Sequence, residues 1–573
     1  MINDFLNKIN LNVNSMIKYG SIAFFSMLFI VLLFGENYAM LAFPITLTSI
    51  ALSFENLNVK PFKKYISLII LDILIISLSF LASLNIYFGV FINFSSIFLI
   101  AYFFTARFNP KIYKPFIMLY VFTSFYPKDF DSLKLRYLSV IFCVTLIFLY
   151  LKLYESKTKV SFLKEVLVSS LKILSSQANS LLISTFDNSL YKNHINITSS
   201  NIYKVYKTKS KKHTVTVLGN IRYEIALSLE IINIFLKENH FLIRSIDPKL
   251  LYDLKNTFIE ILKSLNTKKD LNYIISILEL FISRYKSANY KTLTESLTII
   301  KSNILTLRNL DYSLLKLEYS EWKTSEMFSL KFYTKENLKL SNIRFNFALR
   351  IGLTLTLTLF LSNIVSFYKF LWTSITIMSV MQPYYEDTLV KGKERALSNI
   401  IGILIILILL TLFQNKIFTI FILIISLFLA YGFKEYNKLS FFTAISSLSI
   451  ASLNTNLKLI TVNRLIFVIL GIVIVYISNK FLFPYNLFKG IKSLTLKILN
   501  YDLTILNEIS NIDENFSKVR NYILYNLLSL EKLTQRATSY KMNNLNTFVT
   551  LNKELMHKIG FKSITLKYKS KNL

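Results

Sequence analysis

Four arginines stand at the edges of long apolar stretches of the chain: Arg136, Arg350, Arg395 and Arg464. A guanidinium group stays charged at physiological pH and can donate two parallel hydrogen bonds to a carboxylate. These residues could therefore attract an anionic solute and hold it on its way across a bilayer. The alternative is that they extend to lipid headgroups and only fix the orientation of their helices.

One acid, Asp72, lies well inside an apolar run, in the segment YISLIILDILIISLSF. A charged group at such a place costs about 3 kcal/mol on insertion scales and marks a functional site by default. Asp72 could carry the proton for exchange against a substrate. It could instead pair with Lys60, Lys64 or Arg107 near the end of its helix.

Prolines interrupt two apolar stretches at matching places, at Pro44 and at Gln382-Pro383. A proline leaves a backbone carbonyl without its helical partner, and inside a membrane that group needs water, a side chain or a solute. Short or interrupted spans in corresponding positions indicate a transport site. Trp372 and Tyr384 lie near the second interruption and could stack on an aromatic ring, although Trp372 could also be an interfacial anchor.

The elements that must position these residues are membrane helices in two blocks, residues 19–151 and residues 341–485. About 20 apolar residues span a bilayer core, so the lengths of the charge-free stretches predict six helices in each block. A soluble bundle would need polar faces, and segments such as 400–412 have none. The predicted spans are 19–35, 37–54, two helices over 65–106 that turn near 84–89, 115–127, 137–151, 351–368, 370–385, 396–415, 417–433, 439–457 and 465–479.

The two blocks are related by a nearly constant shift along the chain, which indicates a duplication. Many transporters are built from two repeats with the substrate site between them. The pairs that the shift aligns are Glu55 with Glu386, Lys60 with Lys391, Lys64 with Arg395, Asn109 with Asn437 and Arg136 with Arg464.

The distribution of basic residues predicts the orientation. Lys and Arg number 66 against 33 Asp and Glu, for a net charge of +33. The basic residues favour the connections that lie on the same side as the N-terminus. The positive-inside rule therefore places residues 1–18, 152–340 and 486–573 in the cytoplasm of a cell-membrane protein. This explains the charge better than binding of nucleic acid does.

The cytoplasmic insert 152–340 and the tail 486–573 show apolar residues at helical spacing. We therefore expect an all-α, polytopic membrane protein with a helical insert and a helical tail. Residues 187–213 are rich in Lys, Asn and Ser and predict a mobile loop. The expected helices of these parts are 164–183, 218–237, 249–265, 271–285, 293–307, 494–506 and 519–536.

Short motifs in the second block point to a family. They are Ala348–Arg350, Trp372-Thr373, Thr376, Gln382-Pro383, Thr388, Arg395 and Gly402. Residues 347–402, which hold them, resemble the fusaric acid resistance (FUSC) family of membrane transporters, which includes aromatic-acid exporters and is similar to plant malate channels. The family usually has Gly-Thr after the arginine, where this chain has Ser398-Asn399. The resemblance implies two six-helix membrane domains, a cytoplasmic helical insert and export of small, often aromatic, organic acids.

The substrate path that we expect combines this resemblance with the residues singled out above. It comprises Arg350, Trp372, Thr376, Gln382, Pro383, Tyr384, Arg395, Pro44, Arg136 and Arg464, with Asp72 for proton coupling.

Several functions are disfavoured by the sequence. The single cysteine, Cys143, excludes an internal disulfide and a cysteine-based metal site, and only four histidines are present. Nucleotide-binding, nucleophile-elbow and zinc-protease motifs are absent, so we expect no enzyme, cofactor or metal. The predicted function is gradient-driven efflux of organic anions, with a passive anion channel and a non-transporting envelope scaffold as alternatives. The expected partners are the lipid bilayer and small organic anions, without nucleic acid. A second copy of the chain and an accessory efflux protein are further candidate partners.

Overall fold

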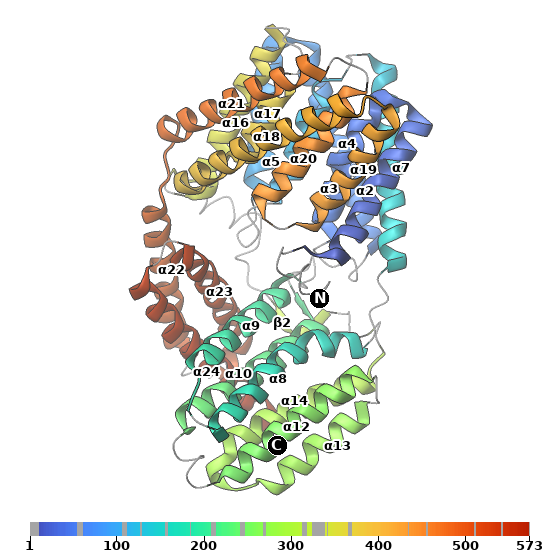
Figure 1. The fold of residues 1–573 in the computed structure, drawn as a ribbon. Coiled ribbons are helices and arrows are strands. Elements are labelled where there is room, and N and C mark those ends of the chain that lie inside the picture. The colour runs from blue at the N-terminus through green and yellow to red at the C-terminus, as the bar shows by residue number, and fades with distance from the viewer. Residues whose placement is uncertain are drawn as a thin grey trace. The chain divides into compact units, whose positions relative to one another are not determined.

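A computed structural model shows two compact units, and each is described by itself (Figure 1). Unit 1 comprises Met1–Glu155 with Thr334–Gly490, and unit 2 comprises Ser156–Tyr333 with Ile491–Leu573. The structure describes residues 11–53, 61–105, 112–126, 129–154, 159–183, 185–207, 214–240, 247–267, 271–311, 314, 318–323, 338–340, 342–364, 370–433, 435–453, 457–508, 512–539 and 542–571.

Unit 1 consists of two sets of helices, and each predicted apolar stretch overlaps at least one helix. The first set is α2 (Val13–Phe34), η1 (Glu36–Leu41), α3 (Ala42–Ser53), α4 (Pro61–Leu84), α5 (Ile86–Phe104), α6 (Tyr113–Thr123) and α7 (Phe130–Tyr154). The second set is α16 (Ile343–Ile364), α17 (Leu371–Val380), α18 (Tyr385–Leu412), α19 (Lys416–Gly432), α20 (Tyr436–Ser452) and α21 (Leu457–Phe481). The predicted turn near 84–89 is confirmed, because α4 ends at Leu84 and Asn85 caps α5 by accepting hydrogen bonds from the amides of Tyr87 and Phe88.

The helices of unit 1 differ in length more than the sequence predicts. Seven of them are long and apolar enough to cross a membrane: α2, α4, α5, α7, α16, α18 and α21. The other five have only 10 to 17 residues. At 1.5 Å per residue these helices fall short of a 30 Å bilayer core. The prediction of twelve full-length helical spans is therefore not confirmed.

Corresponding helices of the two sets make corresponding contacts. α2 packs on α3 as α16 packs on α17, and α4 packs on α6 and α7 as α18 packs on α20 and α21. The sets join through α16 against α5 and through α19 against α2. The predicted duplication remains a prediction, although this packing order agrees with it.

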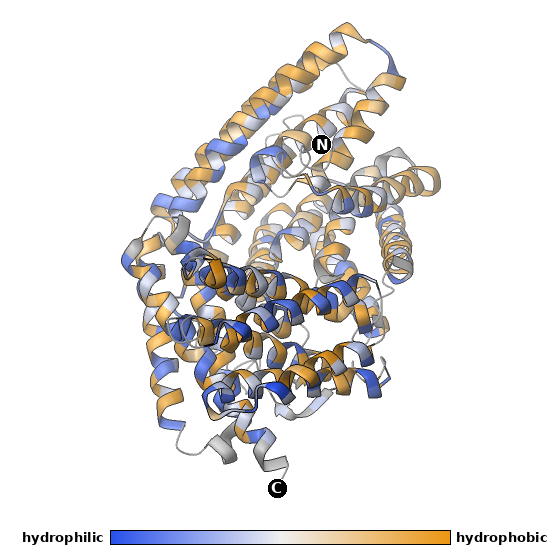
Figure 2. Ribbon diagram, turned by 60° about the horizontal axis from the view of Figure 1, so that its bottom comes forward, coloured by the Kyte–Doolittle hydropathy of each residue, from blue (hydrophilic) through white to orange (hydrophobic). Residues whose placement is uncertain are grey.

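Unit 2 is helical, with one small antiparallel sheet that the sequence did not predict. Its elements are α8 (Lys159–Ile183), α9 (Asn188–Lys207), β1 (Thr214–Thr216), α10 (Val217–Glu238), α12 (Pro248–Asn266), α13 (Leu271–Arg284), η2 (Ala288–Tyr290), α14 (Lys291–Asn309), β2 (Glu318–Lys323), α22 (Leu487–Glu508, which begins in unit 1), α23 (Ile512–Ser539) and α24 (Asn543–Lys571). All seven helices expected in these parts are present. Figure 2 shows how apolar and polar residues alternate along many of the helices.

The predicted loop over 187–213 is wrong for most of its length, because residues 188–207 form α9. Asp187 caps this helix by accepting hydrogen bonds from the amides of Ser189 and Leu190. The polar composition hides an apolar face at helical spacing, which buries Tyr191, Ile195, Ile202 and Val205.

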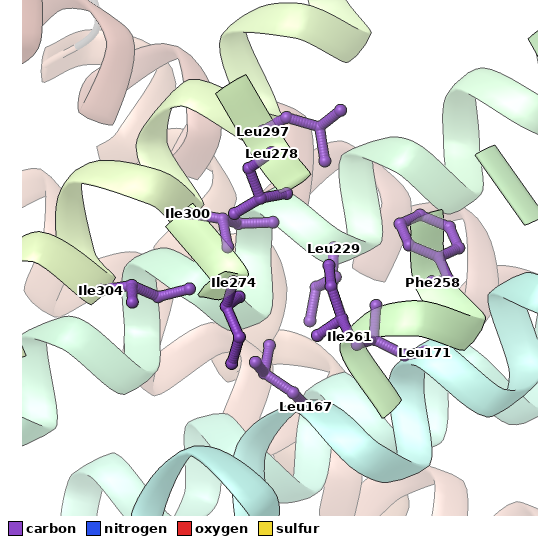
Figure 3. Close-up of a pocket in the computed structure, with 10 residues that line it drawn as sticks. All are labelled: Leu167, Leu171, Leu229, Phe258, Ile261, Ile274, Leu278, Leu297, Ile300 and Ile304. Carbon is purple, nitrogen blue, oxygen red and sulfur yellow. The ribbon is translucent and has the colours of Figure 1, made fainter. Parts of the chain in front are cut away.

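The core of unit 2 is closely packed. The helices α8, α10, α12, α13 and α14 contribute a continuous apolar interior that leaves a cavity of only about 10 Å³ between them (Figure 3). A cavity of this size with an all-apolar lining has no room for a solute. α8 is apolar enough to cross a membrane, but its apolar face packs in this interior.

A buried polar network joins α10 to α14, α23 and α24. The carboxylate of Glu224 accepts hydrogen bonds from Asn220, Arg520, Asn303 and Tyr568, at 3.0 to 3.2 Å. Arg520 also donates to Asn220 at 2.7 Å. Because Glu224, Arg520, Asn220 and Asn303 of this network are buried, it specifies how the tail helices pack on the insert.

Candidate functional site

The Gln382-Pro383 interruption forms a non-helical junction between α17, which ends at Val380, and α18, which begins at Tyr385. Arg350 of α16 donates to the carbonyls of Gln382 and Pro383 at 2.9 Å, and to the carbonyl of Phe483 at 3.2 Å. The guanidinium thus binds the carbonyls that the interruption frees. Arg350 is fully buried and holds three chain segments together.

The same junction fixes the start of α22. The carboxylate of Glu386 accepts hydrogen bonds from the amide of Leu487 at 3.0 and 3.1 Å, which caps the helix. A β-carbon on Gly490 would lie 2.3 Å from the ring of Tyr384, so a side chain there would displace the ring. Tyr384 therefore packs against the first turn of α22.

The side chain of Gln382 also serves the junction. Its amide nitrogen donates to the carbonyl of Met381 at 2.6 Å, and its oxygen accepts from Lys391 at 3.0 Å. Its backbone amide donates to the hydroxyl of Thr388 at 3.0 Å. Of the residues expected in the path, Arg350, Gln382, Pro383 and Tyr384 thus meet at this junction.

Two buried arginines, Arg395 of α18 and Arg464 of α21, lie close enough to interact electrostatically. Arg464 donates through Nε to the side-chain oxygen of Asn399 at 3.1 Å, and Arg395 donates to the hydroxyl of Ser440 at 3.2 Å. The nitrogen of Asn399 donates to the carbonyl of Arg395 at 2.8 Å. We call Arg395, Arg464, Asn399, Ser440 and the neighbouring Trp372 the arginine pair site.

Helix packing places Trp372 at this site. The Arg464 guanidinium lies 5.2 Å from the centre of the Trp372 ring, within the range of a cation–π contact. α17 approaches α21 closely because Gly471 has no side chain: a β-carbon there would lie 2.8 Å from Thr376 and 3.0 Å from the carbonyl of Thr373. Thr376 therefore serves the helix contact, and its hydroxyl donates to the carbonyl of Trp372 at 2.8 Å.

The hydrogen-bonding capacity of the arginine pair is only partly used. The two terminal nitrogens of Arg464 and the Nε of Arg395 make no hydrogen bond to the residues that the structure describes. No carboxylate among those residues pairs with either arginine. Two buried guanidiniums without a counter-charge create a positive potential that suits a carboxylate or another anion.

Arg136, the predicted counterpart of Arg464, has different surroundings. Its guanidinium donates to the carbonyl of Thr123 at 3.3 Å and to the carbonyl and hydroxyl of Ser132 at 3.2 and 3.1 Å. It also lies near the rings of Phe80 and Tyr126. Arg136 thus ties the end of α6 to the start of α7, and it is not in the arginine pair site.

Asp72 is fully buried in α4, in the first set of helices. Its Oδ2 accepts a hydrogen bond from Thr48 of α3 at 3.1 Å, and its Oδ1 has no partner in the described part of the chain. No ion pair with Asp72 is seen there. Lys60 and Arg107, two of its candidate partners, lie outside the described residues.

Pro44 is buried in the first turn of α3. A proline at that position lacks an amide that would have no helical partner in any case. The predicted span over 37–54 is thus divided into η1 and α3, and Pro44 lies just after the division.

Asn399 and Ser440 belong to the site although neither was predicted to line the path; Asn399 was noted only as a departure from the family pattern. Asn399 follows Arg395 by four residues, a spacing that places both on one helix face. α18 also begins at Tyr385 rather than at the predicted 396, with Glu386 and Asp387 in its first turn. Arg395 therefore lies inside the helix, although the charge-free stretch still begins directly after it. Ser440 lies on another helix, α20, so residue spacing within one segment could not predict its contact with Arg395.

Unit 2 contains a separate acid–base cluster. Glu230 accepts hydrogen bonds from His194 at 2.6 Å, Thr198 at 2.8 Å and Asn233 at 3.1 Å. Burial raises the pKa of Glu230, but the His194 charge and hydrogen bond bring it below the usual range. Burial lowers the pKa of nearby His557 to about 4. Among the described residues, no group of three or more His, Cys, Asp and Glu could hold a metal ion.

Comparison with known proteins identifies the region that holds the arginine pair. Residues 357–478 match the family model described as fusaric acid resistance protein-like. No curated protein and no solved structure matches the chain. The matched range extends from α16 to α21 and includes every residue of the arginine pair site. Eight helices of the described chain are long and apolar enough to cross a bilayer. The chain is therefore a multi-pass membrane protein in which residues 357–478, the range that holds the arginine pair, are similar to the fusaric acid resistance protein-like family.

Proposed function

We propose that this protein exports small organic anions, aromatic acids among them, across the cytoplasmic membrane. The observation that carries the proposal is the arginine pair. Arg395 and Arg464 are buried side by side, retain free donors and have no carboxylate partner among the described residues. A carboxylate bound there would neutralise two desolvated charges and accept their free hydrogen bonds.

Trp372 supports an aromatic substrate class. Its ring already lies against the Arg464 guanidinium, so an aromatic acid could place its carboxylate on the arginines and its ring on the indole. In this arrangement Arg350, Gln382 and Pro383 position the site through the junction and do not contact the substrate.

Asp72 is the proposed proton carrier of the transport cycle. It is buried without a cationic partner in the described part, and one of its oxygens has no hydrogen bond. Protonation would remove an uncompensated charge from the first set of helices while an anion occupies the second set. Efflux would then be driven by the proton or potential gradient.

Transport by the purified chain in proteoliposomes tests the proposal. We expect saturable flux of a hydroxybenzoate that a pH gradient drives. Arg395→Gln and Arg464→Gln should each lower flux at subsaturating substrate roughly thirtyfold, because a lost charge-assisted hydrogen bond costs about 2 kcal/mol. Arg284→Gln is the matched control, because Arg284 is exposed and paired with Asp253 in unit 2. Wild-type flux in both site variants would remove the arginine pair from the path.

The same assay separates the alternatives. Large currents that reverse at the anion equilibrium potential would indicate a passive channel. The absence of flux for every anion tested would indicate a non-transporting scaffold. Asp72→Asn should abolish the increase in flux that a pH gradient causes. Exchange of substrate across the proteoliposome membrane should remain. A variant that still responds to the gradient would exclude Asp72 as the proton carrier.

A further inference from the structure

The outer face of α22 carries an apolar stripe that no described residue covers. Leu496, Leu499, Leu503 and Leu506 follow one another at intervals of three and four residues and therefore share one face of the helix. Their side chains are between 46% and 60% exposed, and Phe488 at the start of the helix is 71% exposed.

The opposite face of α22 already has its partners. Ile498, Tyr501 and Ile505 are buried, and the Tyr501 ring lies 6.1 Å from that of Tyr522 on α23. Asp502 accepts a hydrogen bond from Asn552 of α24 at 2.6 Å. The exposed stripe is therefore a second apolar face, beyond the one that packs in unit 2.

Both acids of α22 are paired, whereas two of its three lysines lie in the sector of the stripe. Its two acids are occupied: Asp502 points to α23 and α24, and Glu508 pairs with Lys518. Lys489 and Lys492 are exposed, lie in the sector of the stripe and form no ion pair with the described residues. A surface that covers the stripe must thus accept both apolar side chains and positive charge.

We propose that α22 lies on the membrane surface and binds acidic phospholipids through this stripe. An amphipathic helix with basic residues beside its apolar face inserts that face among acyl chains, and its lysines contact anionic headgroups. The beginning of α22 belongs to the membrane-spanning unit, since Glu386 caps it and Tyr384 packs on Gly490. Only residues 482–486 separate it from the membrane helix α21.

A second copy of the chain fits the stripe less well. The three–four spacing of the leucines resembles a coiled-coil seam, but its continuation toward the N-terminus places Lys489 and Lys492 in that seam. A parallel pair of α22 helices would bring these like charges together. This inference is independent of the proposed transport function.

Spin labels on the full-length chain test the proposal. Leu499→Cys and Leu503→Cys are prepared in a Cys143→Ala background and labelled with a nitroxide in nanodiscs. The bilayers are phosphatidylcholine with or without phosphatidylglycerol. Leu280→Cys is the control, because Leu280 is 70% exposed on α13 of unit 2.

With phosphatidylglycerol, we expect an oxygen-to-nickel accessibility ratio at both positions several-fold above that of the control. Lys489→Gln with Lys492→Gln should lower this ratio. A ratio equal to the control at both positions would overturn the proposal. Strong spin–spin coupling between copies would overturn it in favour of a second chain.

Discussion

At the scale of single residues, the arginines that looked alike in the sequence have distinct surroundings. Arg350 binds three backbone carbonyls, and Arg136 binds a carbonyl and a serine. Arg395 and Arg464 instead lie together and keep donors that no described residue uses. An arginine binds backbone where nearby carbonyls lack a helical hydrogen bond, because an unpaired carbonyl in a membrane needs a donor.

Arg350→Lys should destabilise the protein rather than alter the substrate preference. A lysine has no planar fork and cannot hold carbonyls from two segments at once. We expect a loss of about 2 to 3 kcal/mol, measured as a lower melting temperature in detergent by fluorescence-detected size exclusion. Normal stability combined with a raised KM for the anion would instead place Arg350 at the substrate.

His557 makes the stability of unit 2 depend on pH. Burial lowers its pKa to about 4 from the ordinary 6.5, so the unfolded chain binds the proton more readily than the folded chain. The stabilisation is complete above pH 6.5 and is lost as the pH falls toward 4. Between pH 6.5 and about pH 5 the free energy of unfolding should fall by about 2 kcal/mol.

Trp322 reports this change, because it is fully buried in unit 2. In a Trp372→Phe background, the fluorescence of Trp322 measures the unfolding of unit 2, once near pH 7.5 and once near pH 5. His557→Leu removes the titrating group and should reduce the difference between the free energies of unfolding at the two pH values. An equal difference in both chains would assign the acid sensitivity to other groups.

At the scale of elements, the close contact of α17 with α21 determines whether Trp372 reaches Arg464. Gly471→Ala would place a β-carbon 3.0 Å from the Thr373 carbonyl, which cannot move without its helix. We expect a cost of about 1 to 3 kcal/mol and a clear loss of aromatic-acid flux. Gly402→Ala is the control, because its nearest neighbour is a methyl group of Ala444 at 3.2 Å. Equal flux in the two variants would argue against a role of the α17–α21 contact.

Several elements could not be predicted from local sequence. α9 has a polar composition, and only its burial against α10 makes its apolar face apparent. β1 and β2 are short, and the helices α10 to α14 separate them along the chain, so neither carries a signal of its own. α8 shows the opposite: it is apolar enough to cross a membrane, but its apolar side chains pack in the core of unit 2.

At the scale of the whole molecule, the division of the chain into membrane and aqueous parts is the central prediction. Ser176 lies on the exposed side of α8, and Leu32 is 70% exposed on the membrane helix α2. In a Cys143→Ala background, Ser176→Cys should react with an impermeant maleimide only after the cells are opened. Leu32→Cys should remain unlabelled in both conditions because it faces lipid.

Two results would contradict this topology. Labelling of Ser176→Cys in intact cells would place unit 2 outside the cell. Protection of Ser176→Cys even in opened cells would place α8 in lipid, despite its packing in the interior of unit 2.

The sequence by itself determined the class of protein, the two sets of apolar helices and most helix positions. These follow from hydropathy and periodicity, which depend on neighbours a few residues apart. The motifs around Arg395 also predicted the resemblance to the fusaric acid resistance family, and residues 357–478 match the model of that family.

Only the tertiary structure decided which polar residues meet. Arg395, Asn399, Ser440 and Arg464 come from three helices, and their contacts depend on how α18, α20 and α21 pack. Helix packing also separated Arg350 from the arginine pair. The physical reason is that a buried donor or acceptor pairs with the polar group that helix packing places beside it. The spacing of residues along one segment does not show which group of another helix that is.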